Sequence, residues 1–63
     1  MSSTFANELR QMRKAAGLTQ QGMADRMLIP KRSIESWEGD QRTPPPYEQR
    51  FVLNELKSIA EEK

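Results

Sequence analysis

The feature that most constrains the fold of this chain is a segment with two short helical patterns and a tight turn between them, residues 17–39. The first pattern covers about residues 19–27 and begins at Thr19, whose side-chain oxygen can cap a helix. The turn contains Pro30, which disfavours helical geometry in the residue before it and suits the first turn of a following helix. The second pattern therefore covers about residues 30–39.

The second pattern has two distinct faces. At about 100° per residue, Ile34 and Trp37 fall on the same side and form an apolar stripe. The polar residues of the opposite side and its flank are Lys31, Arg32, Glu35 and Ser36. One face therefore suits the core and the other is available to a partner. This is the layout of a helix-turn-helix, whose second helix lies in the major groove of DNA.

The remaining segments have the pattern of supporting helices. Residues 4–16 carry apolar side chains at helical spacing, and N-cap oxygens are offered by Ser2, Ser3 and Thr4. After a stiff run of three prolines, a last helix is expected over about residues 46–61. We therefore expect an all-α fold, a compact four- to five-helix bundle that forms a single domain over residues 1–63.

The apolar stripes define the expected core. In the first three helices the core residues are Phe5, Leu9, Leu18, Met23, Ala24, Met27, Ile34 and Trp37. Trp37 is better explained as a core residue than as a platform for base stacking, because it shares its stripe with Ile34. The apolar residues of the last helix are Tyr47, Phe51, Leu56 and Ile59. These can form a homodimer surface or close the core of the monomer, and both uses stay open at this point.

Composition limits the chemistry of the chain. Its 63 residues include no Cys and no His, which excludes disulfides, zinc fingers and catalysis by a thiol or an imidazole. The carboxylates are scattered and show no acid–base or metal-binding arrangement, so we expect no catalytic residue, no metal and no cofactor. The apolar runs are too short to span a bilayer, and the N-terminus does not resemble a signal peptide, which favours a cytoplasmic protein without membrane contact.

The charge is nearly balanced but unevenly placed. The net charge is +1, and seven basic against five acidic residues lie within residues 1–45, which contain the two-helix segment. Binding to a polyanion at this segment should be moderate and strongly dependent on salt, because it rests on few phosphate contacts.

A longer pattern connects these segments. It consists of Leu9-Arg10-Gln11-Met12-Arg13, Gly17-Leu18-Thr19-Gln20, Ile34-x-x-Trp37-Glu38 and Arg42-x-Pro44. Over about residues 5–44 this pattern resembles the Cro/C1-type (XRE) helix-turn-helix family, which includes phage repressors and many bacterial regulators and antitoxins. The chain departs from the family at three positions. Leu28 stands where the turn usually has Gly, Pro30 stands at a usual Ser or Thr cap, and Asp40 stands where Gly is common.

The resemblance implies a role for several side chains. Base contacts would come from the third helix, at Lys31, Arg32, Glu35 and Ser36, and Gln20 would contact the DNA backbone. Arg13 and Glu38 would form a structural ion pair. Arg10 and Arg42 are candidate phosphate contacts, and an ordinary solvent role is an equal alternative for both. For Lys31 and Arg32 the alternative is a solvated basic face, and Glu35 would either accept from cytosine or repel phosphates.

The function expected from these residues is sequence-specific binding of double-stranded DNA by a small phage or bacterial transcriptional regulator. It would bind a near-palindromic site as a homodimer, because one short helix contacts too few bases for useful specificity. The alternative is a protein-interaction module, such as an antitoxin or accessory factor that holds a protein partner. A large apolar patch left exposed on the last helix would favour this second function.

Overall fold

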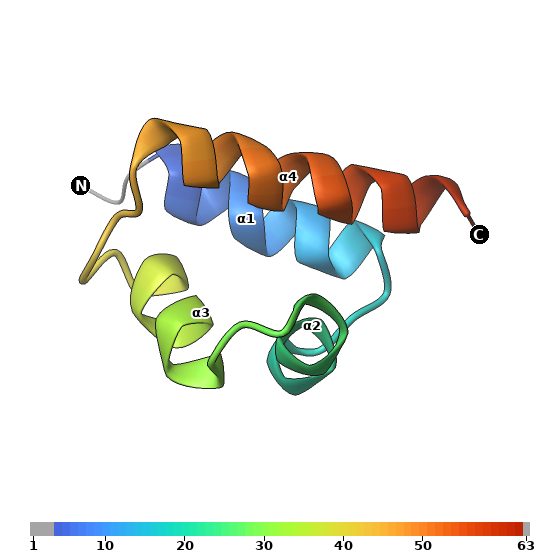
Figure 1. Cartoon of the computed structure of the whole chain (residues 1–63), viewed down its shortest axis with the longest axis horizontal. Coiled ribbons are helices and arrows are strands. Elements are labelled where there is room, and N and C mark those ends of the chain that lie inside the picture. Colours follow the sequence, from blue (N-terminus) through green and yellow to red (C-terminus); the bar gives the residue numbers. More distant parts are fainter. Residues whose placement is uncertain (1–3, 63) are drawn as a thin grey trace.

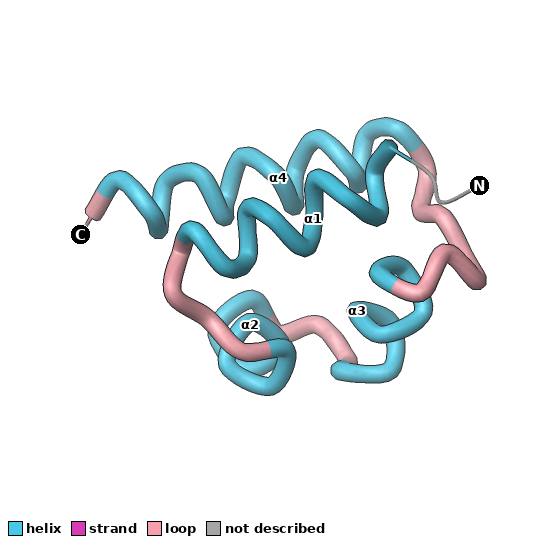
Figure 2. The backbone as a smooth tube through the Cα atoms, turned by 180° about the vertical axis from the view of Figure 1, so that it is seen from behind, coloured by secondary structure: helices cyan, strands magenta, loops and turns pink. Residues whose placement is uncertain are grey.

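The computed structural model describes residues 4–62. These residues form four α-helices and no β-strand: α1 (Thr4–Ala15), α2 (Gln20–Met27), α3 (Lys31–Glu38) and α4 (Pro46–Glu61). α4 lies alongside α1, while α2 and α3 lie on the other side of α1 (Figures 1 and 2). The structure is therefore the all-α fold expected from the sequence, with four helices. Of the expected caps of the first helix, Ser2 and Ser3 lie outside the described residues, and Thr4 is the first residue of α1.

A left-handed residue ends each of the first three helices. After α1 this residue is Gly17, with a φ of 74°. The backbone N–H of Leu18 closes the turn by donating to the carbonyl oxygen of Arg13 at 3.1 Å. Such a turn satisfies carbonyl groups that have no partner within the helix and redirects the chain sharply. α1 therefore ends at Ala15, one residue before the expected boundary.

The turns after α2 and α3 have the same form, but their left-handed residue is not glycine. Leu28 has a φ of 56° and Asp40 a φ of 60°. In this region the Cβ atom lies too close to the backbone, which costs a residue other than glycine about 1–2 kcal/mol. These are two of the positions where the resemblance leads one to expect glycine. The chain thus forms the left-handed turns even though Leu28 and Asp40 adopt this conformation at a cost in free energy.

The two helices of the central segment begin differently. At the start of α2, the Thr19 hydroxyl accepts a hydrogen bond from the backbone N–H of Gly22 at 2.9 Å, as expected for an N-cap. A Cβ atom on residue 22 would lie 3.2 Å from that hydroxyl oxygen, so glycine allows the cap to stay close. At the start of α3, Pro30 occupies the cap position and provides no side-chain hydrogen bond. Its fixed φ of −57° nevertheless leads the chain into the helix.

All four helices contribute to one apolar core. The buried apolar residues are Phe5, Ala6, Leu9, Ala16, Met23, Ala24, Ile34, Trp37, Val52, Leu56 and Ile59. Leu18 and Met27, which were expected in the core, are half-buried against it. The rings of Phe5 and Trp37 meet edge to face with centroids 6.2 Å apart, a favourable arrangement for two aromatic side chains. This contact fixes α3 against the start of α1.

The structure places two of the four expected apolar residues of α4 in the core of the monomer and two on its surface. Leu56 and Ile59 are buried in the core of the monomer. Tyr47 and Phe51 instead lie on the surface, with 75% and 57% of their areas exposed. The core therefore closes on the later part of α4, and the beginning of the helix presents two aromatic rings to solvent.

Candidate nucleic-acid interface

α3 presents a polar face outward and an apolar face inward. Ile34 and Trp37 are buried, whereas Lys31, Arg32 and Glu35 are exposed. Ser36, the fourth expected base contact, is half-buried. Neither cation forms an ion pair or side-chain hydrogen bond within residues 4–62. Both positive charges are therefore free to meet a negatively charged partner.

A buried ion pair holds α3 against α1. Arg13 Nε donates to Glu38 Oε2 at 2.7 Å, and Arg13 Nη2 donates to Glu38 Oε1 at 3.1 Å. Arg13 Nη1 also donates to the carbonyl oxygen of Leu18 at 2.9 Å. The hydrogen bond to Glu38 raises the pKa of the Arg13 guanidinium above its already high usual value. The pair expected from the resemblance is thus formed, with a permanently charged cation.

Arg10 has a structural contact that the sequence analysis did not anticipate. Its Nη2 atom donates to the backbone carbonyl oxygen of Glu38 at 2.8 Å. A cation at a helix C-terminus satisfies an unpaired carbonyl and interacts favourably with the helix dipole. Arg10 and Arg13 are three residues apart, and hence on the same side of α1, which is a signal that could have linked both to α3.

Gln20 is held by the same carboxylate. Its Nε2 atom donates to Glu38 Oε1 at 3.3 Å, and the side chain is half-buried at the first residue of α2. This position lies beside the backbone N–H groups of the first turn, which favour an anion. Glu38 therefore connects α1, α2 and α3. It also positions the side chain of Gln20, which the resemblance leads us to expect at the DNA backbone.

The linker after α3 folds back onto the last turn of that helix. The carbonyl oxygen of Ser36 accepts hydrogen bonds from the backbone N–H groups of Gln41, at 2.9 Å, and Arg42, at 3.4 Å. Further along, Pro44 is buried, and its carbonyl oxygen accepts from Gln49 Nε2 of α4 at 2.8 Å. The linker is thus fixed at both ends, which places the side chain of Arg42 next to α3.

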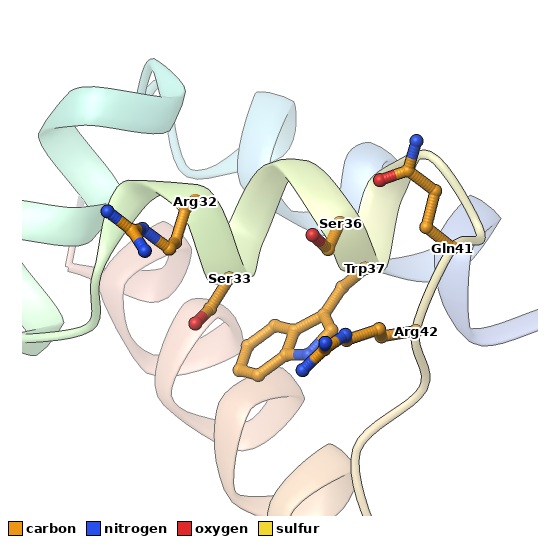
Figure 3. A pocket seen from close by; sticks show the side chains of 6 residues that line it. All are labelled: Arg32, Ser33, Ser36, Trp37, Gln41 and Arg42. Carbon is orange, nitrogen blue, oxygen red and sulfur yellow. The ribbon is translucent and has the colours of Figure 1, made fainter.

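A pocket of about 460 Å³ lies between α3 and this linker (Figure 3). The residues that line it are Arg32, Ser33, Ser36, Trp37, Gln41 and Arg42. Ser33 and Gln41 were not among the expected site residues. On a helical wheel Ser33 falls between Ser36 and Trp37, so its position was available from the sequence, whereas Gln41 lies in a linker without periodicity.

A family model described as a helix-turn-helix domain matches residues 4–54, which include α1, α2, α3 and the first half of α4. The chain belongs to the helix-turn-helix domain family. Membership suggests that its partner is DNA, because these domains place a helix in the major groove. No curated protein and no solved structure matches the chain.

Within residues 4–62, no group of three or more acidic side chains is placed to hold a metal ion. None of the helices in that range has both the length and the apolar character that crossing a bilayer requires.

Proposed function

We propose that this helix-turn-helix domain is a Cro/C1-type (XRE) protein that binds double-stranded DNA in a sequence-specific manner, and that it is a transcriptional regulator rather than an enzyme. The single observation that carries the proposal is the division of α3 into two faces. Lys31 and Arg32 are exposed and unpaired, while Ile34 and Trp37 anchor the helix in the core. A bacterial or phage regulator of this kind would work in the cytoplasm, where its DNA is.

In this proposal α3 enters the major groove with its N-terminal half. Lys31 donates to the O6 and N7 atoms of guanine, Glu35 accepts from the N4 amino group of cytosine, and Ser36 adapts to either partner. Gln20 and Arg42 contact phosphates on the two sides of the groove. Arg10 can add a phosphate contact only with the donors that the carbonyl oxygen of Glu38 leaves unused.

The proposal includes a homodimer. An α3 of eight residues offers few base contacts, so specificity requires two half-sites about one helical turn apart. Tyr47 and Phe51 support a dimer surface on α4, because they are large, neighbouring on the helix, and exposed. Leu56 and Ile59 do not contribute to it, since they are buried in the monomer.

Selection of bound duplexes from a random DNA pool tests the proposal. We expect enrichment of a near-palindromic site with two half-sites, and binding that weakens steeply from low to moderate salt. Absence of duplex binding at low salt would refute the proposal, because even non-specific binding persists under those conditions.

A second function, as an antitoxin or accessory factor, is favoured by the same exposed aromatic side chains, Tyr47 and Phe51. A partner protein would cover them instead of a second copy. The two functions differ in what the isolated chain does. A regulator binds duplex DNA and dimerises alone, whereas a partner-dependent factor remains monomeric and binds duplex DNA only when its partner is added.

A further inference from the structure

The pocket between α3 and the linker has the chemistry of an anion site. Arg32 and Arg42 bring two positive charges to it, and no carboxylate is among the residues that line it. The other lining side chains, those of Ser33, Ser36 and Gln41, each provide at least one hydrogen-bond donor. A pocket lined by two guanidinium groups and further donors favours a negatively charged group with several oxygen atoms.

Trp37 adds a donor to the same pocket. Its ring nitrogen has no hydrogen-bond partner within residues 4–62, and no side-chain nitrogen or oxygen in that range is both buried and unpaired. The indole N–H therefore reaches solvent. Figure 3 shows the indole ring lying across the pocket, between Ser33 and Arg42. The ring thus forms part of the pocket wall, and its N–H can donate a hydrogen bond to a ligand.

The pocket separates the polar residues of α3 into two groups. Arg32 and Ser36 are one turn apart on the side that faces the pocket. Lys31 and Glu35 are also one turn apart, but neither lines the pocket. One strip of α3 therefore belongs to the pocket, and the neighbouring strip faces outward without it.

We propose that this pocket binds a single phosphate group, which Arg32 and Arg42 hold together. When the phosphate belongs to DNA, an extension that rests on the function proposed above, Arg32 anchors the backbone and the main base contacts are Lys31 and Glu35, with Ser36 at the border of the pocket. The guanidinium fork matches phosphate oxygens in geometry and charge. The volume of about 460 Å³ exceeds that of a phosphate group.

The dependence of duplex binding on salt tests whether the two arginines share one phosphate. The variants are Arg32→Gln, Arg42→Gln and the double variant, with Arg50→Gln as a control that removes an exposed positive charge from α4. If one phosphate is shared, the slope of log K against log salt falls by about 0.9 per protomer in the double variant. A fall of about 1.8 would mean two separate phosphates and would overturn the proposal.

The preferred bases provide an independent readout. Arg32→Gln should weaken binding to all duplexes equally and leave the selected sequence unchanged, whereas Lys31→Gln should relax one position of it. A change of preferred base in Arg32→Gln would show that Arg32 reads sequence and would overturn the proposal. The melting temperature of each variant, followed by circular dichroism, shows that the exposed substitutions leave the fold intact.

Free phosphate is tested without DNA, so that failure of the pocket and failure of DNA binding are distinguishable. Trp37 is the single tryptophan of the sequence and lines the pocket, so its emission responds to binding there. Inorganic phosphate is titrated against chloride at constant ionic strength. A saturable change, lost in the double variant and kept in Arg50→Gln, supports the site with free phosphate as its ligand. If the chain binds neither duplex nor free phosphate, the proposal is overturned; if it binds only duplex with the expected slopes, the phosphate is that of DNA.

Discussion

Arg13 and Glu38 form a two-pronged ion pair, with hydrogen bonds of 2.7 and 3.1 Å, and their side chains are only 12% and 5% exposed. The pair joins the first helix to the end of the third. Because α3 has only eight residues, its orientation depends strongly on such an attachment. The stability of the fold and the position of the outward face of α3 therefore depend on the same contact.

Replacing Glu38 by Gln should destabilise the protein by about 3 kcal/mol, because the substitution leaves the guanidinium of Arg13 largely buried without its counter-charge. Chemical denaturation followed by circular dichroism measures the loss. Glu61→Gln, which removes an exposed carboxylate from α4, should change stability by less than about 0.5 kcal/mol. Equal effects of the two substitutions would show that the buried pair has no special role.

Adding Arg13→Met to Glu38→Gln should recover part of that loss. The double variant no longer buries an unpaired cation, so its destabilisation should be smaller than the sum of the two single changes. A double-mutant cycle from the same denaturation curves gives the coupling energy. Strictly additive effects would contradict a direct interaction between the two side chains.

Replacing Lys31 by Ala should cost about 1–3 kcal/mol of binding free energy at the preferred site and relax the base preference at one position of each half-site. The reason is that Lys31 is exposed on the outward strip of α3 and has no partner within residues 4–62. Titration of duplexes that differ at single positions measures both effects. Lys57→Ala, on the exposed side of α4, serves as control and should leave the base preference unchanged. The prediction fails if Lys31→Ala weakens all duplexes to the same extent.

Replacing Leu28 by Gly should stabilise the protein by about 0.5–1 kcal/mol. Glycine removes the strain of a left-handed residue, about 1–2 kcal/mol, and part of that gain is offset by its greater freedom in the unfolded chain. Little packing is lost, because Leu28 is 90% exposed. Leu28→Ala keeps the Cβ atom and should show no comparable gain. Thermal denaturation of the two variants side by side decides the matter, and equal melting temperatures would contradict the strain argument.

Replacing Phe51 by Glu should abolish the proposed dimer and leave a folded monomer. Phe51 is 57% exposed, so the isolated protomer loses little packing, whereas a surface shared between two copies would gain two buried carboxylates. Analytical ultracentrifugation measures the oligomeric state. Lys57→Gln changes the net charge by the same amount and should leave the dimer intact. A wild-type chain that is monomeric at high concentration would contradict the dimer and favour a separate protein partner.

The positions of the helices could be predicted because they rest on local patterns. Thr19, Pro30 and Gly17 mark helix boundaries through their own backbone and side-chain preferences, and the observed boundaries differ from the expected ones by about one residue. The opposite orientation of Arg32 and Ile34 likewise follows from helical periodicity alone. The Arg13–Glu38 pair came from the family resemblance, since nothing local connects residues that distant in sequence.

Other features lay outside what local patterns provide. The pocket depends on the hydrogen bonds that the backbone N–H groups of Gln41 and Arg42 donate to the carbonyl oxygen of Ser36. The linker has no periodic sequence pattern from which such bonds could be predicted. The division of α4 could have been anticipated in part. Leu56 lies about 140° around the helix from Phe51, so the two do not share a narrow stripe. Which of them meets the core is set by the packing of α4 on α1.

Glu38 touches side chains from both neighbouring helices, Arg13 of α1 and Gln20 of α2, and it belongs to α3 itself. These contacts therefore fix the angle between α2 and α3 within the chain itself. When the angle between two protein helices is fixed, a bound duplex must change its own shape to fit them. DNA bends more readily at some base steps than at others. In the proposed complex, the preference among DNA sequences should therefore extend to base pairs that no side chain contacts. The reason is that the energy needed to deform the duplex depends on the sequence of those base pairs.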